Sequence, residues 1–172
     1  MFMRLFAVMI AVAFFAGGCG GTAVTPPKPG GLDTSTVADG IRIRASVASS
    51  VLDLSGQPAV DVTVTNESQA TVSFLKFNGC DNGVHVTLED TSGAVGSFRR
   101  EVPPVVCTQA LAMATLAPGG TIRDRYVWAP AGDVPAPAAG EYRIVVRYQR
   151  ADSMESVRPI AAEMKVAIQG SR

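Results

Sequence analysis

Apolar and polar residues alternate along most of the chain after residue 40, and this two-residue period constrains the fold more than any other feature. The alternation is clear over 41–47, 60–65, 84–89, 142–149 and 160–168. Clusters of Gly, Pro, Asn and Asp separate the runs, and no amphipathic helical period lies between them. Successive side chains of a strand point to opposite faces, so each run is typical of a strand with one buried face. The pattern predicts an all-β domain over residues 40–170, an antiparallel β-sandwich of about seven to nine strands.

The segment before this domain resembles an export signal. Arg4 precedes an apolar run over residues 5–16, which is too short for a permanent membrane span but typical of a signal helix. The run ends in Ala16-Gly17-Gly18-Cys19, which resembles the lipobox of bacterial lipoproteins, with Ala16 where that motif favours Leu. The resemblance implies a signal peptide over residues 1–18 and acyl chains on Cys19. An ordinary secretory signal is the alternative.

Residues 20–39 are rich in Gly, Pro, Ser and Thr and show no apolar period. This composition predicts a disordered linker over residues 19–39, between the lipidated cysteine and the domain. We therefore expect a protein of the cell envelope, outside the cytoplasm and held to a membrane by its lipid. Gly20, directly after the cysteine, resembles the sorting signal for the outer membrane, where an organism has two membranes.

The three cysteines divide into one anchor and one pair. With Cys19 assigned to lipid, Cys80 and Cys107 are left, and an even pair in an exported domain predicts a disulfide. Closing a loop of about 27 residues would stabilise the fold by about 3.5 kcal/mol.

Charge and residue inventory exclude several classes of function. Fifteen basic residues balance fifteen acidic ones, so no bulk attraction to nucleic acid is expected. His85 is the only histidine, and a blue-copper site needs two. No Gly-x-Ser-x-Gly motif or Asp-rich calcium loop is present. We predict no catalytic residues, no metal and no cofactor, and we expect His85 to face solvent.

One apolar segment is a candidate contact strip for a partner, because loops at the ends of sandwiches carry recognition. It lies just before Cys107 and just after two arginines. The candidate contact residues are Val102, Pro103, Pro104, Val105, Arg99 and Arg100.

Arginines also alternate with core residues in two strands that we expect to be neighbours. A basic patch for an anionic surface polymer or an acidic protein is one hypothesis. Pairing with carboxylates across a solvated sheet face is the other. The arginines are Arg123, Arg125, Arg143 and Arg147, with Arg99 and Arg100 beside them, and the carboxylates are Asp61, Glu141 and Glu163.

A series of short motifs resembles immunoglobulin-like bacterial domains, in particular the BsuPI-type intracellular proteinase inhibitor family. The motifs, in order, are Val64-Thr65-Asn66, Phe74, Asp90–Gly93, Thr108-Gln109, Leu116–Gly119, Trp128 and Gly140–Tyr142. The resemblance implies an immunoglobulin-like sandwich. It also implies that Tyr142 is a tyrosine-corner residue, with its ring in the core and its hydroxyl bonded to nearby backbone.

These features together predict a non-enzymatic envelope lipoprotein, a monomer whose sandwich binds another protein or a surface polymer. The family resemblance suggests a proteinase inhibitor acting through an exposed loop as the alternative. A small envelope enzyme is the third hypothesis.

Overall fold

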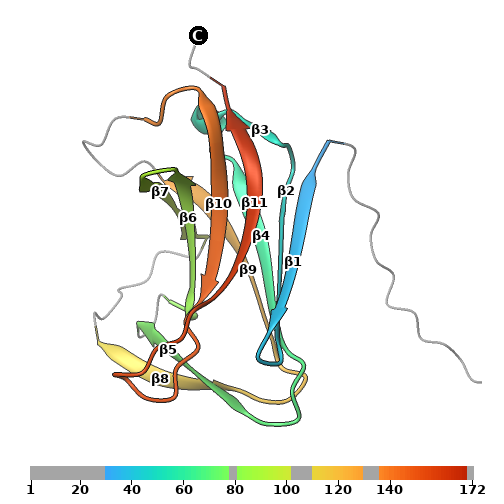
Figure 1. Cartoon of the computed structure of the whole chain (residues 1–172), viewed down its shortest axis with the longest axis vertical. Coiled ribbons are helices and arrows are strands. Elements are labelled where there is room, and N and C mark those ends of the chain that lie inside the picture. Colours follow the sequence, from blue (N-terminus) through green and yellow to red (C-terminus); the bar gives the residue numbers. More distant parts are fainter. Residues whose placement is uncertain (1–29, 78–80, 102–109, 130–135, 170–172) are drawn as a thin grey trace, which may run out of the picture.

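The computed structural model describes residues 30–77, 81–101, 110–129 and 136–169. Over these ranges it contains eleven strands and one short 3₁₀ helix, η1 (Leu54–Gly56) (Figure 1). The strands are β1 (Leu32–Ala38), β2 (Ile41–Val47), β3 (Val51–Leu52), β4 (Ala59–Asn66), β5 (Val72–Phe77), β6 (Val84–Asp90), β7 (Gly93–Arg100), β8 (Leu111–Leu116), β9 (Thr121–Ala129), β10 (Gly140–Tyr148) and β11 (Ile160–Ile168). The predicted all-β class is confirmed.

Nine of the strands form one sheet in the order β1-β2-β4-β9-β7-β6-β10-β11-β3. Neighbours are antiparallel, except that β3 runs parallel to β11. The sheet curls so strongly that β1 comes to lie beside β11 (Figure 1). The two remaining strands, β5 and β8, form a separate antiparallel pair across one end of the curled sheet (Figure 1).

The sandwich prediction implied two separate sheets. Strand β7 instead joins β6 to β9, so the main sheet is continuous. Phe98 of β7 lies opposite Val86 of β6 on one side and opposite Trp128 of β9 on the other. The β6–β7 ladder shifts register between Leu88 and Glu89, and such irregularities increase the local bend of a strand pair. The nine strands of the main sheet thus curl into one half-barrel, and β5 and β8 pack with them around a single core.

Strand β1 corrects the predicted linker over residues 19–39. Residues 32–38 of that stretch pair with β2 along their whole length, from Leu32 opposite Val47 to Ala38 opposite Ile41. Asp39 and Gly40 join the two strands with positive φ values of 50° and 73°. Asp-Gly is a strong two-residue hairpin signal, because both central positions of that turn need positive φ. The folded domain therefore includes β1 and does not start at residue 40.

The core follows the predicted alternation. Most inward residues of the long strands are buried, and the residues between them face outward. Those with no exposed area are Ile41, Ile43, Val60, Val64, Leu88, Ile144, Val146 and Tyr148. Val145 is also fully buried. Because Ile144 and Val146 on either side of it point into the core, the side chain of Val145 points to the outer face of the sheet. Neighbouring side chains on the outer face must therefore cover Val145.

Asn66, at the end of β4, holds one end of the fold together. Its side-chain amide donates to the carbonyls of Ala70 and Leu116, at 2.8 and 2.9 Å. Its side-chain oxygen accepts from the backbone N–H and the hydroxyl of Ser68. Its backbone N–H and C=O bond to Gly120 and Gly119 in the β8–β9 turn. A fully buried amide is thus satisfied on every side, and two of the motifs that resemble the inhibitor family meet here.

Candidate functional site

A cleft of about 480 Å³ lies at the end of the curled sheet where β10 begins and β11 ends. Four separate stretches line it: 50–51, 89–91, 141–143 and 165–167. The strand ladders bring them together, because Arg143 of β10 lies opposite both Glu89 of β6 and Lys165 of β11. The parallel contact of β3 places Val51 opposite Ala167 and closes the cleft on its far side.

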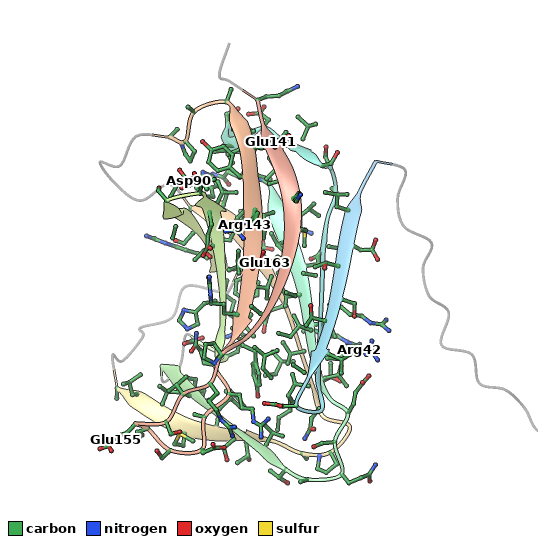
Figure 2. All side chains as sticks on the ribbon, viewed as in Figure 1. Arg42, Asp90, Glu141, Arg143, Glu155 and Glu163 are labelled. Carbon is green, nitrogen blue, oxygen red and sulfur yellow. The ribbon has the colours of Figure 1, made fainter. Side chains whose placement is uncertain are left out.

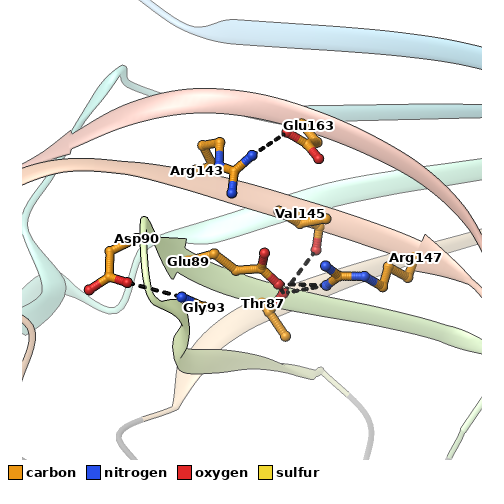
Figure 3. A network of polar contacts seen from close by, with 8 residues as sticks. All are labelled: Thr87, Glu89, Asp90, Gly93, Arg143, Val145, Arg147 and Glu163. Atoms are coloured by element: carbon orange, nitrogen blue, oxygen red, sulfur yellow. Dashed lines mark hydrogen bonds and ion pairs between the residues drawn. The ribbon is translucent and has the colours of Figure 1, made fainter.

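Beside the cleft, Glu89 is at the centre of a polar network on the outer face of β6 and β10 (Figure 3). Its carboxylate accepts from the Arg147 guanidinium at 2.6 Å and from the Thr87 hydroxyl at 2.8 Å. Glu89 is nearly buried, and its hydrogen bond to Arg147 holds the pKa of the carboxyl below its ordinary value in spite of this burial. The network also covers Val145, whose backbone carbonyl lies 3.4 Å from the Thr87 hydroxyl (Figure 3). Glu89 is therefore an ionised structural carboxylate.

Asp90, on the rim of the cleft, shapes the predicted turn into β7. One carboxylate oxygen accepts from the Ser92 backbone N–H at 2.7 Å and the Ser92 hydroxyl at 2.6 Å. The same oxygen accepts from the Gly93 N–H at 3.2 Å (Figure 3). The bonds to Ser92 are the main reason that the pKa of Asp90 is lowered. Gly93 follows with a φ of 128°, a conformation that other residues rarely adopt. Asp90 thus serves the hairpin.

The remaining charges of the cleft are exposed. Arg143 bonds to Glu163 on β11 at 3.1 Å (Figure 3). About half of each side chain remains open to solvent. Glu141 and Lys165 are exposed and form no hydrogen bond or ion pair within the described part of the chain. Val51 adds an apolar surface that is 43% exposed. The mouth of the cleft therefore presents one carboxylate, one ammonium group and apolar surface together.

Tyr142 behaves as the resemblance implied. Its half-buried ring packs against the core, and its hydroxyl donates to the backbone carbonyl of Ala138 at 2.9 Å. The bond ties the start of β10 to the chain just before it and fixes one wall of the cleft.

A second polar cluster lies on the inner side of the sheet, at its opposite end. Asp124 accepts from Arg100 at 2.7 Å and from the side-chain amide of Asn82. The Tyr126 hydroxyl donates to the Asn82 side-chain oxygen at 2.8 Å, and burial raises the pKa of Tyr126. The groups satisfy one another, so this cluster joins β6, β7 and β9. The sequence did not predict this cluster, because Asp124 and Arg100 become neighbours only through the β7–β9 ladder.

Several predicted site residues lie outside the described residues. These are the lipidation site Cys19, the pair Cys80 and Cys107, and the contact residues Val102, Pro103, Pro104 and Val105. The lipid anchor, the disulfide and the contact strip thus stay predictions. Of the two arginines assigned to the same strip, Arg99 is exposed, and Arg100 is engaged with Asp124.

The hypothesis of a single basic patch made by Arg123, Arg125, Arg143 and Arg147 is wrong. It required β9 and β10 to be neighbours, but β7 and β6 lie between them. The alternative of ion pairs is confirmed for three of the arginines. Arg125 lies 3.7 Å from Asp61, Arg143 pairs with Glu163, and Arg147 pairs with Glu89, which was not foreseen. Arg123 has no ion pair among the described residues.

His85 is exposed on β6, as predicted, and its ring nitrogen lies 3.4 Å from the Asp81 carboxylate. Over the described ranges, no three side chains of His, Cys, Asp or Glu are grouped so as to hold a metal ion. No helix in the same ranges is long and apolar enough to cross a membrane.

No protein-family model and no curated protein matches the sequence. Among solved structures, the chain is similar to a β-glucosidase from Listeria innocua, in complexes with laminaribiose and with isofagomine. Each match has 19% identity and a TM-score of 0.40, and covers 79% of this chain. The chain corresponds to 16% of the length of that enzyme. A likeness at this level says nothing about the activity of this chain.

Proposed function

We propose that this chain is an envelope lipoprotein, anchored through Cys19, whose immunoglobulin-like β-domain binds a protein or a surface polymer without catalysing a reaction. The cleft at the ends of β10 and β11 is the observation that carries the binding role. It places the uncompensated charges of Glu141 and Lys165 beside the exposed apolar side chain of Val51. Binding sites combine apolar surface with a few polar groups that fix orientation.

The state of two cleft carboxylates, Glu89 and Asp90, supports a role without catalysis. A general acid needs a raised pKa to be protonated near neutral pH. The pKa values of Glu89 and Asp90 are both lowered, by Arg147 and by the turn at Ser92 respectively. Both side chains are occupied by structural bonds.

A site-specific cross-linking experiment tests the binding role. A photoreactive amino acid at Val51 or Glu141 of the full chain, irradiated in intact envelopes, is expected to give one discrete adduct. The same probe at Met154, which is 55% exposed and lies outside the cleft, is the control and should give none. With the probe at Val51, the double substitution Glu141→Lys and Lys165→Glu should abolish the adduct. An adduct of equal yield from Met154, or none from either cleft position, contradicts the proposal.

The anchor is tested separately by metabolic labelling with a fatty-acid analogue. We expect the full chain to take up label and Cys19→Ala to lose both the label and membrane association. Persistent labelling of Cys19→Ala would show that the lipobox interpretation is wrong.

The second candidate is a proteinase inhibitor, favoured by one observation. Asn66 bonds directly to Leu116 and the following glycines, so two motifs that resemble the inhibitor family pack together at one end of the fold. An inhibitor would form a stoichiometric complex with a protease, and replacing residues 102–106 would abolish it. A screen against serine, cysteine and metalloproteases distinguishes this function from the first.

A further inference from the structure

The outer face of β1, β2, β4 and β9 carries a row of polar side chains at one level of the sheet. The ladders place Ser35 opposite Arg44, Arg44 opposite Thr63, and Thr63 opposite Arg123. The flanking residues in β2 and β4 are buried in the core, so the row points outward. A hydroxyl, a guanidinium, a second hydroxyl and a second guanidinium therefore follow one another across four strands.

The two arginines of the row differ from those around them. Arg42 makes a two-pronged contact with Glu67, at 2.5 and 3.1 Å, and Arg125 lies within 4 Å of Asp61 and Glu101. Arg44 and Arg123 are exposed and have no hydrogen bond or ion pair to any described residue. Their donor groups are thus available to a ligand, although the charge of Arg44 also helps to lower the pKa of Glu67.

The surface around Arg44 is hollowed. A groove of about 570 Å³ runs over β1, β2 and β4, and its polar lining includes Ser35, Arg42, Arg44 and Thr63. The carboxylates of Asp33 and Asp61 line it as well, and Asp61 lies 3.7 Å from Arg125. Arg42 projects from this side of the molecule, away from β10 and β11 (Figure 2). The groove and the free Arg123 beyond it form a shallow track across the strands.

We infer that this track binds an extended polysaccharide that carries carboxylate groups. The guanidinium group bonds a carboxylate through two parallel N–H donors, and hydroxyl side chains can both donate to and accept from sugar hydroxyls. Arg44 and Arg123 are two strands apart, roughly 10 Å at the usual strand spacing, which suits acidic groups on alternate sugars. The two guanidinium groups could bind a phosphate polymer as well, but the hydroxyls that alternate with them favour a sugar chain. The track shares no residue with the cleft of the proposed function, so the inference adds a second binding surface and names the class of its ligand.

Binding of the full chain, purified in a neutral detergent, to polygalacturonate tests the inference. We expect saturable binding that weakens as ionic strength rises, because exposed charges are screened by salt. The double variant Arg44→Gln/Arg123→Gln should lose at least about tenfold in affinity, since each charged hydrogen bond contributes substantially. The control variant Lys76→Gln/Arg158→Gln removes the same charge from residues outside the groove and should bind as the unchanged chain does.

Three results would overturn the inference. These are no binding to polygalacturonate, an equal loss in the control variant, and equal binding to polyphosphate or to anionic phospholipid vesicles. Neutral dextran should not bind. If cross-linking from Val51 succeeds while polygalacturonate binding fails, the proposed function survives and this inference alone is wrong.

Discussion

At the scale of single residues, Tyr148 is the clearest exception to the rule that buried polar groups are bonded. Its side chain is fully buried against Phe74, and its hydroxyl finds no partner among the described residues. Tyr148→Phe is expected to leave the free energy of unfolding unchanged or to raise it by about 1 kcal/mol, because it removes a hydroxyl without a partner. Tyr126→Phe is the matched variant, since its hydroxyl does bond to Asn82, and it should lose about 1 kcal/mol. Urea unfolding of both variants measures the difference, and a larger loss for Tyr148→Phe would reveal an unseen partner.

Also at this scale, the Glu89–Arg147 pair predicts a pH dependence. Glu89→Gln should destabilise the protein at pH 7 by about 1–2 kcal/mol, a value discounted because a third of Arg147 is open to solvent. The pKa of Glu89 is lowered in the folded state, so its stabilisation is complete above the ordinary glutamate value of about 4.3. It is lost as the pH falls through the lower folded-state value. Urea unfolding from pH 7 to pH 3 should show the two proteins converge, and a constant difference would contradict this account.

At the scale of the element, β7 depends on the absence of a side chain at Gly96. A Cβ there would lie 2.1 Å from the Trp128 ring, whose edge-on contact with Phe98 fixes it in the core. Gly96→Ala should lower the free energy of unfolding by about 1–3 kcal/mol through overpacking. Gly56→Ala, with no neighbour closer than 4.0 Å, is the control and should be nearly neutral. Combining Gly96→Ala with Trp128→Phe should cost less than the sum of the single changes, and thermal melts of all four variants test this coupling.

Elements also show how far the sequence alone predicts this fold. The long strands with apolar alternation, such as β2 and β11, were predicted at the residues where they occur, because burial on one face imposes the period. Strand β1 was missed because its inward positions carry Thr34 and Thr36 between Leu32 and Ala38, so the apolar period is weak. Only the Asp39-Gly40 turn marked it. The alternation predicts which face of the sheet each residue points to, but it does not predict which strands pair. The Arg44–Thr63–Arg123 row and the Glu89–Arg147 pair depend on strand pairing, so the sequence alone could not predict them.

At the scale of the whole molecule, the curl of the sheet makes its first strand part of the stable unit. Strand β1 is one edge of the sheet, where it pairs with β2, and it also contacts β11 near the other edge. It therefore brings the two edges of the half-barrel together. Removing residues 20–39 should lower the melting temperature by roughly 10 °C, since losing the strand costs about 3 kcal/mol in buried side chains and paired backbone. Removing residues 20–29 alone leaves β1 intact and should not change it. Circular dichroism of the two deletion variants and the full chain decides between a domain that begins with β1 and one that begins at residue 40. Equal stability of the longer deletion would show that β1 adds nothing to the half-barrel.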